Sequence, residues 1–150
     1  MALTYKKAGV DIARADALLN GLKRVIRATH GPEVLADRGQ FASLVRLPAG
    51  RWREPVLVSS TDGVGTKLAL ATTPQDHVGI GIDVVAMNVN DILVYGAQPL
   101  FFLDYVAMGT LKPALFRALV RGIAQGCRHS GCALVGGETA ELPGMYRNGE

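Results

Sequence analysis

The fold is decided by residues 100–136, LFFLDYVAMGTLKPALFRALVRGIAQGCRHSGCALVG. Residues 100–107 and 132–135 are apolar runs bounded by turn signals, which predicts two strands. Between them, residues 113–129 predict a helix, because the run opens on a proline suited to a first turn. Gly131 suits the left-handed cap of that helix. Strand, helix and strand in this order predict one crossover unit.

The chain before this unit predicts two more helices and two more strands. Apolar residues recur at helical spacing over residues 11–30, and Gly31-Pro32 ends that helix. Residues 41–47 and 55–60 predict strands, and residues 79–95 predict a buried helix. We therefore expect an α+β fold with a mixed or antiparallel sheet and helices on one face.

The composition predicts a single folded domain spanning residues 1–150. The 150 residues are 49% hydrophobic with a net charge of +3, which favours a core and excludes a disordered chain. Residues 78–95 form the most apolar stretch, but two Asp and two Asn within it exclude a membrane span. The first ten residues show no signal peptide, so we expect a cytoplasmic location and no membrane partner.

Two cysteines, Cys127 and Cys132, are the only ones in the sequence. A C-x4-C pair without a second pair is weak evidence for zinc. We expect two small buried thiols in a reducing compartment.

Charge is distributed unevenly along the chain. The first 54 residues hold ten Lys and Arg against five acids, whereas residues 55–111 hold one lysine against five Asp. Nucleic-acid binders usually gather their bases with aromatic residues on one face. Aromatic residues make up only 6% of this chain, so we expect no nucleic-acid partner.

The loop after the second strand, residues 59–67, is the first candidate site. Gly63 and Gly65 allow the backbone to approach a ligand, and Thr66 and Lys67 suit a phosphate. Asp62 offers a carboxylate suited to Mg²⁺. The order Gly-Thr-Lys differs from a P-loop. A plain glycine turn capped by Asp62 remains an equal alternative.

The helix over residues 79–95 carries the second candidate. Asp83, Asn90 and Asp91 share one helical face, and Asn88 lies one turn from Asp91. Asp83 and Asp91 are separated by about 12 Å along the axis, too far to chelate one ion side by side. They could mark two ends of a polyphosphate. The alternative is a polar stripe that caps loops or faces a partner subunit.

The third candidate follows the last strand. Gly136 and Gly137 are expected to free backbone amides, and Glu138 and Glu141 offer two hard oxygen ligands. The alternative is a capping box at a helix start, with Thr139 or Gly137 as the cap.

In this order and spacing, the sequence resembles the phosphoribosylformylglycinamidine cyclo-ligase family, also called aminoimidazole ribonucleotide synthetase. Five segments carry the resemblance: Tyr5–Ile12, Thr61–Lys67, Gly81–Asp91, Pro99–Tyr105 and Gly136–Tyr146. The resemblance implies an ATP-dependent ligase of purine biosynthesis. Such an enzyme converts formylglycinamidine ribonucleotide to aminoimidazole ribonucleotide, ADP and phosphate.

The resemblance also implies roles for individual residues. Lys67 and Asp91 would be catalytic. The metal ligands for Mg²⁺ would be Asp62, Asp91 and Glu138. The nucleotide and phosphate would be bound by Gly63, Gly65, Thr66, Lys67, Asn88, Gly136, Gly137 and Thr139.

The family fold implies a homodimer in which strands of two subunits join in a shared barrel, with nucleotide near the interface. The resemblance covers only the N-terminal half of the family's chain. Two alternatives follow: a sister ATP-dependent kinase or synthetase, or a fragment that serves only as a dimerisation module without catalysis.

Overall fold

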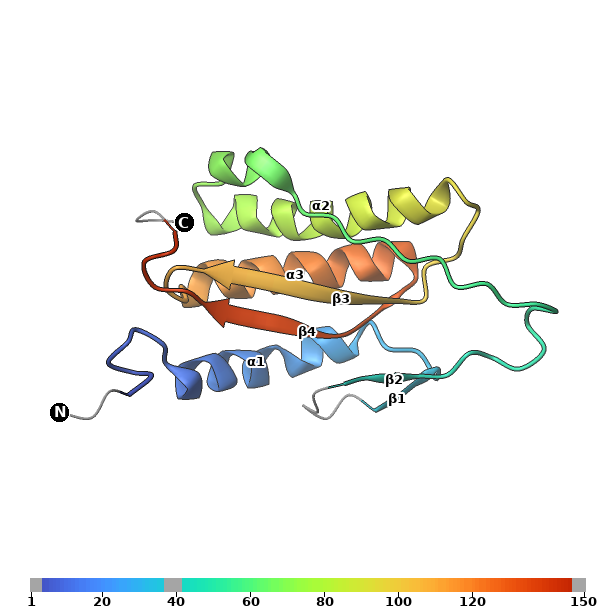
Figure 1. Ribbon diagram of the computed structural model, residues 1–150, viewed down its shortest axis with the longest axis horizontal. Coiled ribbons are helices and arrows are strands. Elements are labelled where there is room, and N and C mark those ends of the chain that lie inside the picture. Colours follow the sequence, from blue (N-terminus) through green and yellow to red (C-terminus); the bar gives the residue numbers. More distant parts are fainter. Residues whose placement is uncertain (1–3, 37–41, 147–150) are drawn as a thin grey trace.

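The computed structural model describes residues 4–36 and 42–146 (Figure 1). The elements, in chain order, are α1 (Ile12–Arg27), β1 (Val34–Ala36), β2 (Leu44–Val45), the 3-10 helix η1 (Gly65–Leu70), α2 (Pro74–Leu93), β3 (Phe101–Met108), α3 (Pro113–Ser130) and β4 (Ala133–Glu141).

The predicted crossover unit is confirmed. β3 and β4 pair in parallel, and α3 connects them. The helix begins at Pro113 and is capped by Gly131 at φ 70° and ψ 27°, a left-handed conformation that glycine adopts without strain. β1 and β2 form a separate antiparallel pair, so the chain holds both kinds of ladder.

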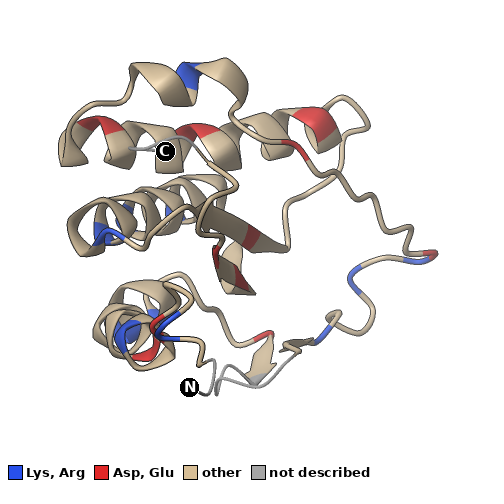
Figure 2. Ribbon diagram, turned by 60° about the vertical axis from the view of Figure 1, so that its left-hand side comes forward, with Lys and Arg blue, Asp and Glu red and all other residues tan. Residues whose placement is uncertain are grey.

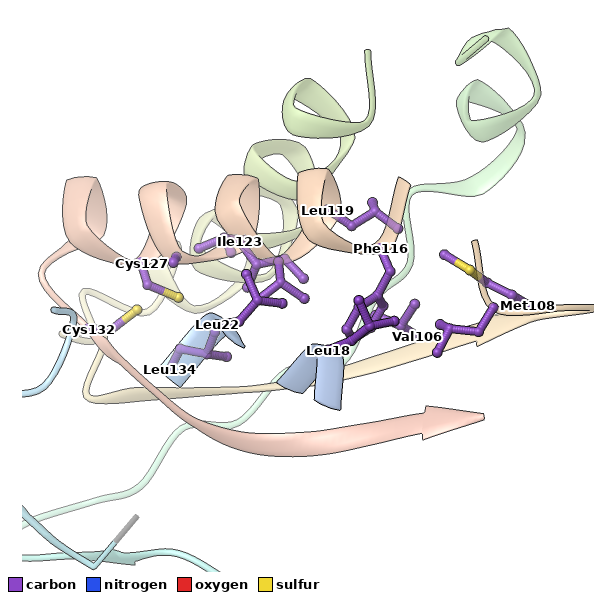
Figure 3. Packing of buried hydrophobic residues seen from close by; sticks show 14 residues of the cluster. Leu18, Leu22, Val106, Met108, Phe116, Leu119, Ile123, Cys127, Cys132 and Leu134 are labelled. Carbon is purple, nitrogen blue, oxygen red and sulfur yellow. The ribbon is translucent and has the colours of Figure 1, made fainter. Parts of the chain in front are cut away.

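α1 and α3 lie against one face of the β3–β4 sheet, as expected, and α2 packs on α3 (Figures 1 and 2). Alternate residues of β3, among them Val106 and Met108, are buried toward α3 and α1. Figure 3 shows these side chains beside Phe116 of α3 and Leu18 of α1.

The opposite face of the sheet is open in the single chain. Phe101, Leu103 and Tyr105 are 47%, 58% and 67% exposed. Their exposure leaves an apolar strip along β3 that the described residues do not cover.

The two helices α2 and α3 approach each other closely through glycines. A Cβ at Gly81 would collide with the Leu119 carbonyl oxygen, and one at Gly122 would collide with the Val78 carbonyl oxygen. Glycine is therefore required at both positions for the backbones to pack at this distance.

α2 begins five residues earlier than the apolar pattern predicts. Thr73 and Asp76 form a capping box, in which the Thr73 N–H donates to Asp76 Oδ2 at 2.9 Å. Hydrogen bonds from Thr73 lower the pKa of Asp76. α2 is also less buried than expected: only His77, Gly81 and Val85 are buried.

α1 is held at both ends. Asp11 caps its start by accepting from the Arg14 N–H at 3.1 Å. After its end, Thr29 Oγ accepts from the Leu134 N–H at 2.9 Å, and His30 Nε2 donates to the Leu134 carbonyl at 2.6 Å. These two side chains occupy the outer edge of β4 in place of another strand.

Two strand predictions are wrong or too long. Residues 55–60 form no strand in the structure; Val56 and Leu57 are 84% and 69% exposed. A strand needs a pairing partner, and the described chain provides none for this segment. Of the strand expected over residues 41–47, only Leu44–Val45 pairs, with β1; Phe41 lies outside the described residues.

No helix in the described ranges is long and apolar enough to cross a membrane. Cys127 and Cys132 are both buried free thiols, as predicted.

Candidate functional site

The glycine loop runs alongside α2 and is hydrogen bonded to it. The Asp62 N–H donates to Asn88 Oδ1 at 2.8 Å, and Asn88 Nδ2 donates to the Asp62 carbonyl at 3.0 Å. Asn88 Nδ2 also donates to the Val84 carbonyl at 2.8 Å, which fixes the amide on its helix. The structure therefore brings together two residues that the sequence predicted in separate segments.

A second contact joins the same loop to the same helix face. Ser60 Oγ donates to Asp91 Oδ2 at 2.6 Å. Because Asn88 and Asp91 are three residues apart on α2, they lie on one face. The loop therefore lies along the face of α2 that carries Asn88 and Asp91, and this places Asp62 next to that face. Sequence reasoning missed Ser60, although its place at the end of an apolar run before Asp62 was a usable signal.

Asp62 also caps the glycine turn, as the alternative interpretation expected. Its Oδ1 accepts from the Gly63 N–H at 2.8 Å. The next turn is η1, which opens on Gly65 at φ 64° and contains Thr66 and Lys67. A left-handed φ at this position favours glycine and lets the chain turn tightly into η1.

Lys67 lies against α2 through an ion pair. Its Nζ is 3.1 Å from Asp83 Oδ2, and the two side chains are 42% and 46% exposed. Figure 2 shows acidic residues spaced along α2 and the basic residue of η1 above them. Exposed ion pairs contribute only about 0–1 kcal/mol, so this one holds Lys67 weakly.

The third predicted segment is built differently from the expectation. The prediction that Gly136-Gly137 ends the strand is wrong, because β4 continues to Glu141. The helix-start alternative is wrong for the same reason. Pairing with β3 holds the strand: Gly137 lies opposite Asp104, where a Cβ would collide with the Asp104 carbonyl oxygen.

The two glutamates of β4 have different surroundings. Glu138 pairs with Tyr105 and is exposed. Glu141 is a structural anchor: its Oε1 accepts from the Leu111 N–H at 2.7 Å, and its Oε2 accepts from the Asp11 N–H at 2.9 Å. Both carboxylate oxygens of Glu141 are therefore used in backbone hydrogen bonds, one of them at the start of α1.

The structure does not bring all predicted ligands together. In residues 4–36 and 42–146, no three His, Cys, Asp or Glu side chains gather closely enough to hold a metal ion. Asp91 lies on α2 and Asp62 in the loop beside it, whereas β4 carries Glu138, Gly136, Gly137 and Thr139. The donors along α2 are hard oxygens, which suit Mg²⁺.

A cavity of about 1560 Å³ opens between the glycine loop, α2 and β3. Asp62, Gly63 and Asn88 line it on one side, and Phe102 and Asp104 line it on the other. Burial raises the pKa of Asp104 from 3.8 to about 6. Asp104 was not among the predicted site residues. The sequence feature that could have identified it is an acid at a core-facing position of an apolar strand.

A family model described as "AIR synthase related protein, N-terminal domain" matches residues 41–149. The chain belongs to this family. Phosphoribosylformylglycinamidine cyclo-ligase from Sorangium cellulosum is 60% identical to this chain over all 150 residues. The enzyme of the same name from Synechococcus sp. CC9902 is 56% identical over 147 residues.

This AIR synthase related domain spans less than half of those relatives: 43% of the first and 42% of the second. The fold is similar to that of thiamine-monophosphate kinase from Stenotrophomonas maltophilia. That match has a TM-score of 0.63 and 22% identity, and covers 81% of this chain and 38% of the kinase. At that identity the likeness concerns the fold alone.

Proposed function

We propose that this chain is the ATP-binding half of a phosphoribosylformylglycinamidine cyclo-ligase, an enzyme of purine biosynthesis. The observation that carries the proposal is the 60% identity to a cyclo-ligase along the whole chain. The docking of the glycine loop on α2 supports it, because it brings the cation of Lys67 and the carboxylates of Asp62 and Asp91 to the same helix.

The proposed reaction uses ATP as a substrate to phosphorylate the formyl oxygen of formylglycinamidine ribonucleotide. A nitrogen of the substrate then attacks the activated carbon, and phosphate leaves as the imidazole ring closes. No covalent enzyme intermediate is needed. Positioning and charge neutralisation would supply most of the rate enhancement.

Residues of the glycine loop and of α2 would have separate roles in this reaction. Lys67 would release Asp83 and bind a phosphate oxygen, since the pair is solvent-exposed and weak. The backbone around Gly63 and Gly65 would approach the phosphates without side-chain obstruction.

Asp62 and Asp91 would hold Mg²⁺, which when bound neutralises phosphate charge. Asn88 already fixes the backbone of Asp62 on α2 and would keep that carboxylate in place. Ser60 orients Asp91 through one carboxylate oxygen. Glu138, Gly136, Gly137 and Thr139 would act from β4, near the phosphates or the second substrate.

The proposed assembly is a homodimer formed over the open face of β3. The exposed strip of Phe101, Leu103 and Tyr105 is apolar and is not covered by the chain's own helices. A second copy that covers this strip would remove its aromatic surface from water.

The proposal is tested by titrating the chain with Mg²⁺-ATP in a calorimeter and repeating the titration with Asp91→Ala. Asp16→Ala removes an exposed carboxyl from α1 and is the matched control. We expect saturable binding by the wild-type chain and the control, and its loss in Asp91→Ala with an unchanged circular dichroism spectrum.

Two results would contradict the proposal. Equal binding by Asp91→Ala would remove that residue from the site. Absence of binding by a folded wild-type chain would favour the alternative, a dimerisation module without a complete nucleotide site. Sedimentation of the same samples would then show whether the dimer forms.

A further inference from the structure

The two cysteines form a contacting pair that the proposed reaction does not use. Cys127 lies in the last turn of α3, and Cys132 comes directly before β4. Their side chains are 0% and 3% exposed and are hydrogen bonded to each other. Figure 3 shows the two sulfur atoms side by side.

The backbone imposes this contact. The Cys132 N–H donates to the Cys127 carbonyl at 3.0 Å, and the Gly131 N–H donates to the Arg128 carbonyl at 3.3 Å. With Gly131 left-handed, these two bonds make a Schellman motif, in which the flanking side chains meet across the helix end. The thiols are therefore held together by the way α3 ends.

The two thiols differ in reactivity. The hydrogen bond between them lowers the pKa of Cys132 and raises the pKa of Cys127, which burial raises further. The thiolate is the nucleophilic form of cysteine, so the direction of these pKa changes favours Cys132 as the attacking residue.

Cys132 is also the cysteine of the pair that borders open space. It lines the cavity next to β3 and a second cavity of about 440 Å³. Arg46, Arg51 and Arg128 line the second cavity as well, against one acid, Glu33. A positive surrounding favours a thiolate.

We propose that Cys127 and Cys132 form a reversible intramolecular disulfide when the protein meets a hydroperoxide. The Cys132 thiolate attacks the O–O bond and becomes a sulfenic acid; with hydrogen peroxide, the released hydroxide takes a proton and leaves as water. The Cys127 sulfur then attacks the sulfenic sulfur. The S–O bond breaks, and the leaving hydroxide takes the Cys127 proton to form a second water.

The balance is two thiols oxidised to one disulfide and one hydrogen peroxide reduced to two waters. A thiol reductant reverses the change by exchange. The bond would tie the end of α3 to the start of β4, the strand that carries Gly136, Gly137 and Glu138.

The test treats the folded, full chain with hydrogen peroxide, alkylates remaining thiols and digests with trypsin. Trypsin cleaves after Arg128, between the two cysteines, so the disulfide would join peptides 122–128 and 129–147. We expect this linked pair in the non-reduced digest and its disappearance after reduction. Full alkylation of both thiols, or bonds only between chains, would overturn the proposal.

Two variants test the assigned roles. Cys127→Ser should leave a sulfenic acid on Cys132 that a dimedone probe captures. Cys132→Ser should leave Cys127 alkylatable after the same peroxide dose. Oxidation of Cys127 in Cys132→Ser at the wild-type rate would refute the assignment of the attacking thiol.

A second pair of variants tests whether the helix end places the two thiols. Gly131→Asn tolerates the left-handed conformation, whereas Gly131→Val disfavours it. We expect disulfide formation about tenfold slower in the valine variant, because the cysteines are no longer held across the helix end. Equal rates in two folded variants would show that the Schellman motif does not place the thiols.

Discussion

Replacing Asp104 by asparagine tests whether this partly buried carboxylate lowers the free energy of unfolding when it ionises. Asp104 lies on the helix-facing side of β3, and burial raises its pKa from 3.8 to about 6. The folded state therefore holds the proton more tightly than the unfolded state. The resulting stability is fully present below pH 3.8 and is lost as the pH rises through about 6.

The size of this effect follows from the two pKa values. Each pH unit between 3.8 and about 6 corresponds to about 1.4 kcal/mol, so ionisation costs roughly 3 kcal/mol at neutral pH. Asparagine has the same shape and no ionisable proton. The variant should equal the wild type in stability near pH 3.5 and exceed it by up to roughly 3 kcal/mol at pH 7.5.

The measurement is urea unfolding followed by circular dichroism, for both proteins, at intervals from pH 3.5 to 7.5. The difference between the two free energies of unfolding isolates this carboxyl from all the others. Asp16→Asn controls for the loss of one negative charge from an exposed position. A difference for Asp104→Asn that stays constant across this pH range would refute the reasoning.

Three further substitutions have expected outcomes. Gly122→Ala should lower the free energy of unfolding by about 1–3 kcal/mol in urea titrations, because the added methyl meets backbone of α2. Gly21→Ala, with nothing within 4 Å of the new methyl, is the control and should be neutral or slightly stabilising. Glu141→Gln should cost about 1–3 kcal/mol in the same assay, because one of two backbone N–H groups loses its acceptor. Asn88→Ala should speed hydrogen exchange at the Asp62 amide without unfolding α2; unchanged exchange would mean the loop is held by other contacts.

The parts of the fold that the sequence predicted well have local signals. Proline at the start of α3 and glycine after its end act on the helix backbone directly, without distant partners. Both boundaries of α3 were therefore predicted closely. The capping box at Thr73 is an equally local signal of the start of α2, and it lies before the apolar pattern begins.

The parts that were missed depend on pairing between distant residues. Gly136-Gly137 indicates a turn by its composition, but the register with β3 keeps the segment in a strand. Residues 55–60 have a strand-forming composition and still lack a partner in the described chain. Pairing of this kind is decided by the fold and not by the segment alone.

The candidate site also combines features with local signals and features that depend on distant residues. Helical periodicity placed Asn88 one turn from Asp91, and the structure adds the loop contacts that bring Asp62 and Ser60 to these two residues. The ion pair between Lys67 and Asp83 could not be predicted, because it depends on where η1 folds back. The proposed substrate came from resemblance and relatives, not from the geometry.

The side chains that follow α1 determine at which edge the β3–β4 sheet can accept a further strand. On β4, both backbone groups of Leu134 are already bonded to Thr29 and His30, and the next carbonyl, of Val135, accepts from Ser43. An incoming strand would have to displace these bonds before it could pair there. β3 has β4 as its only strand neighbour in the described chain. Any additional strand, from this chain or from another copy, would therefore be added at the edge of β3.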